Sequence, residues 1–339
     1  MNREINKYDY IKSLAIILVV IGHITRLYRP DLHPEVDTKY FEIVTRSIYL
    51  FHMPLFMTLS GIFYGMKVKK YTIDIQCFIL NKVRRLLIPY ITTSLILAPI
   101  LLYIKPSSDT GLFVEIIDNA FLFKDTRHLW FILALFQIFA IQILFDKYKI
   151  PIFATFIFSL SIGIIYKVCF QGYAEFACFH MALQYWPYFV FGNIVIKKEY
   201  IGHINILIPC GLLPILLIVR HISSIELIRS ICEYTIAIII VSGLLFSADR
   251  INTDKTSKLF KQIILLISDM SFSIYLFHIP VLFFFHQLSL NCHIHIMIIL
   301  ICLLIFSIII PLIMGYSCRK MRCEFMIGEL NGRIRALSV

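Results

Sequence analysis

Two ionisable residues enclose an apolar stretch near the start of the chain and could take part in proton transfer. Lys12 and His23 lie eleven residues apart in KSLAIILVVIGH. Eleven steps of about 100° end about 20° past three full helical turns, so both side chains share one face, roughly 16 Å apart along the axis. Asp9 lies one turn before Lys12 on this face, and Gly22 leaves room beside His23 for a substrate or another helix. An imidazole at this depth is expected to be neutral and able to accept a proton.

A second imidazole occurs in FHMPLFMTLSGIFYG, residues 51–65. Pro54 is expected to kink the helix, and Ser60 and Gly61 provide a small face for close packing. Helix packing explains these three residues but leaves His52 without a purpose. For Lys12, extension to the cytoplasmic headgroups stays open as a purely structural interpretation.

Three cations precede the apolar run in NKVRRLLIPY, residues 81–90. Lys82, Arg84 and Arg85 are typical of cytoplasmic anchors of a membrane helix. They could instead form an anion-binding lip for phosphate groups, since arginine suits bidentate contact with phosphate. Both interpretations stay open.

A stripe of hydroxyl and imidazole groups is expected in SDMSFSIYLFHIP. Ser268, Ser271, Tyr275 and His278 are spaced by 3, 4 and 3 residues, which predicts one face of a single helix. Such a face suits either a polar ligand or hydrogen bonds to neighbouring helices.

Trp130 and three outer histidines give weaker indications of function than the motifs above. Trp130, in RHLWF, fits an aromatic belt at the membrane surface or a substrate-positioning role. His286, His293 and His295 follow no established ligand spacing, so no metal site is expected.

Membrane helices must position these residues. Of the 339 residues 59% are hydrophobic and 16% are charged, and the mean hydropathy is +0.82. A soluble domain could not bury so much apolar surface, whereas lipid can solvate it. The net charge of +11 is spread over short loops between apolar runs, and no basic face with interleaved aromatic residues occurs. Nucleic-acid binding is therefore not expected.

The expected fold is an all-α polytopic membrane protein with about ten transmembrane helices, because lipid requires backbone groups to pair internally. Residues 1–316 would form the membrane domain and residues 317–339 a short cytoplasmic tail. The segment 105–127 would lie at the interface. The expected spans are about 10–28, 43–66, 86–104, 128–146, 151–169, 178–196, 204–220, 231–248, 263–287 and 294–316.

The distribution of Lys and Arg predicts the orientation. With the N-terminus inside, the inner segments carry 22 of the 32 basic residues and the outer segments carry 10. This asymmetry favours both termini in the cytoplasm, and an even number of spans agrees with it.

Taken in order, these motifs resemble the acyltransferase-3 family of bacterial integral-membrane O-acyltransferases. The resemblance is carried by Asp9 to His23, FHMPLFMTLSG, RRLLIPY, HLWF and SFSIYLFHIP, and it covers the whole chain. Many family members carry Arg where this chain has Lys12. In carrying lysine at this position, the chain resembles the fucose 4-O-acetylase-like branch of the family.

The resemblance implies an O-acetyltransferase of the bacterial cytoplasmic (inner) membrane. It would move acetyl groups from cytoplasmic acetyl-CoA, with no permanently bound cofactor, to hydroxyls of a cell-envelope glycan such as O-antigen, capsule or exopolysaccharide. Its partners would be acetyl-CoA, a glycan or lipid-linked sugar, membrane lipid and proteins of polysaccharide biosynthesis.

Within this scheme His23 is the expected catalytic group, as general base or as acyl carrier. The expected donor-binding residues are Lys12, Lys82, Arg84 and Arg85. The expected positioning residues are Asp9, His52, Ser60, Trp130, Ser271, Tyr275 and His278, of which Ser60, Tyr275 or His278 could donate to a developing oxyanion.

Two other classes of protein stay open. An exporter or flippase of a lipid-linked glycan would also explain many spans, a kinked helix and intramembrane histidines. It would need neither the Asp9–Lys12–His23 helix nor a cytoplasmic arginine pair. A signalling or scaffold protein would explain the spans but not the histidines.

Overall fold

The fold was analysed in a computed structural model that describes residues 4–28, 39–70, 74–104, 127–170, 176–198, 207–251, 256–289 and 295–329. Every regular element in these ranges is helical, and seven helices are long and apolar enough to cross a membrane. The protein is therefore an all-α, multi-pass membrane protein. The expected number of ten spans and the cytoplasmic placement of both termini stay predictions.

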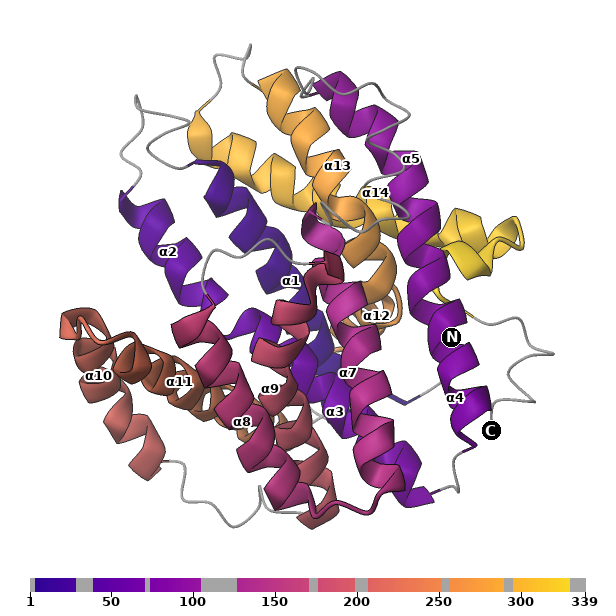
Figure 1. The fold of residues 1–339 in the computed structure, drawn as a ribbon. Coiled ribbons are helices and arrows are strands. Elements are labelled where there is room, and N and C mark those ends of the chain that lie inside the picture. Colours follow the sequence, from indigo (N-terminus) through magenta and orange to yellow (C-terminus); the bar gives the residue numbers. More distant parts are fainter. Residues whose placement is uncertain are drawn as a thin grey trace.

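Helix α1 (Lys7–Leu27) lies in the interior of the bundle (Figure 1). Its N-terminus is closed by a capping box, in which Asn6 accepts from the Asp9 amide and Asp9 accepts from the Asn6 amide. Helices α2, α3, α11, α12, α13 and α14 all pack against it. The helix that carries Lys12 and His23 is thus enclosed by the elements that carry most other polar motifs.

The remaining elements follow α1 in chain order. They are α2 (Lys39–Tyr49), α3 (His52–Lys70), α4 (Ile75–Lys82), η1 (Val83–Leu87), α5 (Ile88–Ile104), η2 (Arg127–Leu129), α7 (Trp130–Lys147), α8 (Ile152–Cys169), η3 (Phe176–Cys178), α9 (Phe179–Lys198), α10 (Leu207–Ile222), α11 (Glu226–Asp249), α12 (Lys258–Asp269), α13 (Ser271–Ser289), α14 (Ile296–Lys320) and η5 (Glu324–Ile327). Helices α8 and α14 are largely exposed along their apolar lengths, as expected for helices that face lipid.

Two expected spans are each divided in the structure. The span 43–66 breaks between α2 and α3 at residues 50–51, one turn before Pro54. Pro54 has no amide hydrogen to offer the carbonyl four residues earlier, so it is accommodated in the first turn of α3. The span 263–287 was wrong as a single helix, because α12 ends at Asp269 and α13 begins at Ser271.

A π-helical turn, η1, interrupts the third apolar segment between α4 and α5 and contains Arg84 and Arg85. Such turns disturb the regular hydrogen-bond pattern and occur often at functional sites. The short helix η5 packs against η1 and α5, and Gly328 lies against the Arg85 carbonyl. The segment 105–126, which was expected at the interface, lies outside the described residues.

Helices α3 and α9 approach so closely that their backbones touch. A Cβ added at Gly61 would lie 1.9 Å from the Phe189 carbonyl oxygen, and one added at Gly192 would lie 2.0 Å from the Thr58 carbonyl oxygen. The expected small face around Gly61 is therefore confirmed. The helix that begins with His52 is thus packed closely against α9 further along its length.

Candidate functional site

Four imidazole side chains from α1, α3, η2 and α13 gather inside the bundle. The His278 ring centroid lies 5.2 Å from that of His23 and 5.7 Å from that of His128. His52 joins this group through Tyr49, whose ring centroid is 4.8 Å from His52 and 6.2 Å from His23. We call His23, His52, His128 and His278 the histidine cluster.

The protonated nitrogen of His278 follows from its neighbours. Its Nδ1 lies 2.9 Å from the carbonyl oxygens of Ile274 and Tyr275, which can only accept, so Nδ1 carries the hydrogen. In the neutral ring Nε2 is then an acceptor. This atom is buried and has no hydrogen-bond partner among the described residues. An acceptor without a protein donor at this position suits a hydroxyl group brought by a substrate.

His52 is held in the same tautomer. Its Nδ1 donates to the Ile48 carbonyl across the break between α2 and α3, at 2.8 Å. The break between α2 and α3 therefore lies at a hydrogen bond that orients the His52 ring, since one ring nitrogen is bonded to the backbone across it.

His128 occupies its place because of a proline in α13. Pro280 has no amide hydrogen, so the Leu276 carbonyl loses its usual helical donor. His128 Nε2 lies 3.2 Å from this oxygen and donates to it. In return, the His128 carbonyl accepts a hydrogen bond from the Tyr275 hydroxyl. The HLWF and SFSIYLFHIP motifs thus interlock, although about 150 residues separate them.

His23 is held more loosely than the other three rings. Its Nδ1 lies 3.4 Å from the Tyr49 hydroxyl, which is longer than an ordinary hydrogen bond. Gly22 allows this approach, because a Cβ there would lie 3.1 Å from the Tyr49 ring. The room expected beside His23 is therefore filled by a second helix, α2. A ring without a tight backbone bond can exchange its proton between nitrogens, as a group that takes and returns protons must do.

The chemistry open to the cluster is acceptance and donation of protons at three buried rings, His52, His128 and His278, and at the partly buried His23. Among the described residues no group of three or more His, Cys, Asp or Glu side chains is arranged to hold a metal ion. Of the three outer histidines considered above, His293 lies outside the described residues. His295 caps α14 by accepting from the Met297 amide.

Asp9 and Ser268 join α1 to α12 rather than forming part of the cluster. Asp9 is buried, and its Oδ1 accepts from the Ser268 hydroxyl at 2.8 Å. The expected four-residue stripe is therefore wrong for Ser268, because the break at Met270 places that serine on a different helix from Tyr275 and His278. Lys12, one turn along α1, is half-buried.

Lys82, at the end of α4, stacks on an aromatic surface. Its ammonium lies 3.4 Å from the Phe139 ring centroid and 5.2 Å from that of Phe78. Burial and the like charges of Arg85 and Lys67 lower the pKa of Lys82, which precedes the apolar part of this segment. Arg84 and Arg85 are exposed on the π turn. The cations of the RRLLIPY region therefore gather at one end of the bundle, whereas Lys12 lies on a separate helix, α1.

The other expected positioning residues occupy varied places. Ser60 donates to the Phe56 carbonyl of its own helix at 2.9 Å. Ser271 is buried at the start of α13. Trp130 opens α7, and its ring centroid lies 5.2 Å from that of Tyr185. Because the hydroxyls of Ser60 and Tyr275 already donate to backbone carbonyls, neither is placed as a ready oxyanion donor.

Two residues of the site were not predicted. His128 was quoted only as part of HLWF, although the carbonyl freed by Pro280 indicated that a donor from elsewhere must pair with Leu276. Tyr49 reaches His23 only because the chain breaks after α2, and no spacing in the sequence indicates this contact.

Comparison with known protein families assigns nearly the whole chain to one family. Residues 5–316 match the acyltransferase-3 family, described as an acyltransferase domain. The chain belongs to this family. The resemblance to this family that the five motifs carry is therefore confirmed.

Individual relatives match a much shorter stretch of the chain. Nodulation protein NolL of Sinorhizobium fredii is 42% identical over 60 residues, and the NolL of Mesorhizobium japonicum is 38% identical over 60 residues. Each match covers 18% of this chain and 15% of the relative. No solved structure matches the chain.

Proposed function

We propose that the protein is an O-acetyltransferase of the bacterial cytoplasmic membrane that moves an acetyl group from acetyl-CoA to a hydroxyl of a cell-envelope glycan. One observation carries this proposal. In a chain of an acyltransferase family, His23 lies beside His278, whose buried Nε2 accepts a hydrogen but meets no donor among the described residues. The placement in the fucose 4-O-acetylase-like branch is part of the proposal and rests on Lys12.

In the proposed reaction His23 is the general base. The sugar hydroxyl oxygen attacks the thioester carbonyl carbon while His23 takes the hydroxyl proton. The carbon–sulfur bond then breaks, and the proton passes from His23 to the departing CoA thiolate. Direct transfer needs no acyl-enzyme, whereas an acetyl group carried on His23 would be detected as a mass increase in the intact protein.

The other members of the cluster position the reacting groups. His278 Nε2 can only accept in its backbone-held tautomer, so it suits a second sugar hydroxyl, beside the one whose proton His23 takes, better than a developing oxyanion. His128 donates to the Leu276 carbonyl and packs edge-on against His278, which fixes that ring in place. The hydrogen bond from His52 Nδ1 to the Ile48 carbonyl orients the His52 ring in the same way.

The donor is proposed to bind through the cations near the π turn. Lys82 has no carboxylate partner among the described residues, and Arg85 and Lys67 lie near it. Phosphate groups of CoA would supply the missing negative charge, and the exposed Arg84 could contact them bidentately. Lys12 would complete the donor path along α1 toward His23.

The test is the acetyl content of the purified glycan, measured by NMR in a deletion strain that carries either the wild-type gene or His23→Ala. Removal of a general base should lower transfer about 10²–10⁴-fold. The matched control is His221→Ala, which removes an exposed histidine at the end of α10. Undiminished acetylation by His23→Ala at normal expression would overturn the catalytic assignment. Loss of the polymer itself from the surface of the deletion strain would favour an exporter.

A further inference from the structure

A pocket of about 230 Å³ opens between the α2–α3 break and helices α8, α9, α10 and α11. Tyrosine side chains and ionised groups form most of its polar wall. The residues that matter here are Tyr49, Tyr185, Tyr188, Lys167, Arg220 and Glu233. None of them was singled out from the sequence, because they come from five different helices.

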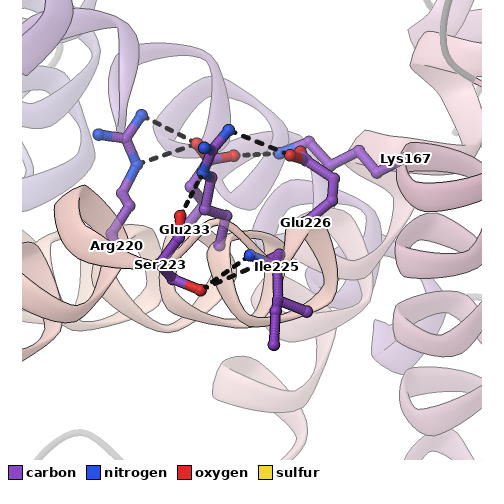
Figure 2. Close-up of polar contacts among 7 residues, drawn as sticks. Lys167, Arg220, Ser223, Ile225, Glu226 and Glu233 are labelled. Atoms are coloured by element: carbon purple, nitrogen blue, oxygen red, sulfur yellow. Dashed lines mark hydrogen bonds and ion pairs between the residues drawn. The ribbon is translucent and has the colours of Figure 1, made fainter.

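The ionised part of the pocket is a triad centred on Glu233. Figure 2 shows its carboxylate between Lys167 and Arg220. Both the Nε and a terminal nitrogen of Arg220 lie 2.9 Å from Glu233 Oε1, and Lys167 pairs with Oε2. The three side chains are each about a quarter to a third exposed, so they face the pocket rather than the protein interior. Hydroxyl groups of a ligand could therefore bond to charges that are already held in place.

The aromatic part of the pocket is carried mainly by α9, and Lys167 of the triad lies 5.5 Å from the Tyr234 ring centroid. The Tyr185 and Tyr188 ring centroids are 6.0 Å apart, and Tyr188 lies 5.3 Å from Tyr234 of α11. Trp130 supports Tyr185 from behind. Tyrosine presents an apolar face together with a polar tip. A sugar ring, with an apolar C–H face and hydroxyls at its edge, matches such a wall combined with an ionic triad.

Tyr49 connects this pocket to the histidine cluster. It lines the pocket, and its hydroxyl lies 3.4 Å from His23 Nδ1. Its ring also packs edge-on against His52. A ligand seated against Tyr49 would therefore place a hydroxyl next to the proposed base.

We infer that this pocket is the acceptor subsite and that it holds one sugar ring of the glycan, with the reacting hydroxyl directed past Tyr49 to His23. The volume is below the roughly 300–1,000 Å³ of pockets for drug-sized ligands, which fits a single ring rather than an oligosaccharide. The inference rests on the proposed function, because it assigns the second substrate of the same reaction.

The test separates glycan recognition from donor binding. Glu233→Gln removes the negative charge that holds the triad, and Tyr185→Ala removes an aromatic wall. For both variants we expect at least a tenfold lower acetyl content of the purified glycan by NMR, with wild-type affinity for acetyl-CoA in calorimetry of the full-length protein. Glu226→Gln is the matched control, since it changes a glutamate on the same helix that pairs with Arg229 outside the pocket.

Each other result has a defined meaning. Wild-type acetylation by both pocket variants would overturn the subsite and leave the proposed function intact. If the variants lost both acetyl-CoA binding and acetylation, these residues would be shown to support the fold. That result would also overturn the assignment of the acceptor subsite. A wild-type protein that binds no acetyl-CoA would instead overturn the proposed function.

Discussion

The histidine cluster and the Glu233 triad are both polar groups inside an apolar bundle, but they satisfy their polar atoms differently. In the triad, charged side chains from three helices pair with one another. In the cluster, His52, His128 and His278 each bind a backbone carbonyl through one nitrogen. The Glu233 carboxylate is thus paired within the triad, which keeps one surplus positive charge, whereas the second nitrogen of His278 meets no donor among the described residues.

This difference separates recognition from reaction. A carboxylate held by two cations keeps its charge and its geometry, which suits repeated binding of a neutral, hydroxyl-rich ligand. Neutral imidazoles aimed by the backbone keep an acceptor available for a proton. Tyr49 is the side chain that belongs to both regions, since it lines the pocket and contacts His23 and His52.

The largest expected effect comes from His278→Ala. It removes the acceptor nitrogen beside His23 and leaves a sugar hydroxyl without its partner, which costs about 1–3 kcal/mol. Acetyl transfer should therefore fall roughly 5–150-fold, measured as acetyl content of the purified glycan. Because the ring, among the described residues, hydrogen-bonds only to the backbone of its own helix, we expect α13 to remain folded and the protein to reach the membrane at normal level. If His278→Ala transferred acetyl groups within twofold of the wild type, the histidine cluster would not take part in the reaction, and its proposed difference from the Glu233 triad would be contradicted.

Much of the cluster could be predicted from the first helix and from the motif order. The eleven-residue spacing correctly placed Lys12 and His23 on one helix, and α1 spans Lys7–Leu27 without interruption. Pro54 correctly indicated a disturbance, which appears as the break before α3. Both succeed because helical periodicity and the missing amide of proline act within one or two turns of the chain.

The contacts between helices could not be predicted in the same way. The break at Met270 is one residue long, between Asp269 and Ser271, and the apolar runs on both sides of it predicted a single span. Glu233, Lys167 and Arg220 meet only because α8, α10 and α11 pack together, and each alone resembles a residue at a helix end. Pairings across the bundle depend on helix rotation and packing, which periodicity in one segment does not specify.

A smaller effect, on stability, is expected when the triad is broken. Glu233→Gln leaves Lys167 and Arg220 facing each other without a carboxylate. The cost should lie between the ~1 kcal/mol of an exposed pair and the ~3–5 kcal/mol of a fully buried one, because these side chains are partly exposed. Thermal unfolding in detergent measures it. Glu226→Gln, which loses a more exposed pair at 3.3 Å, should unfold close to the wild-type temperature, and equal losses for both variants would contradict the special position of Glu233.

The smallest effect is expected at Tyr49, where the two regions meet. Tyr49→Phe removes a hydroxyl that lies 3.4 Å from His23 Nδ1 but keeps the ring in the pocket wall. A neutral hydrogen bond contributes about 0.5–1.5 kcal/mol, so transfer should fall by no more than about tenfold. Tyr49→Ala also removes the ring against His52 and should lower transfer further, with acetyl-CoA binding unchanged. If Tyr49→Ala transferred acetyl groups as well as Tyr49→Phe, the ring would not guide the acceptor, and the pocket and the histidine cluster would have to act independently.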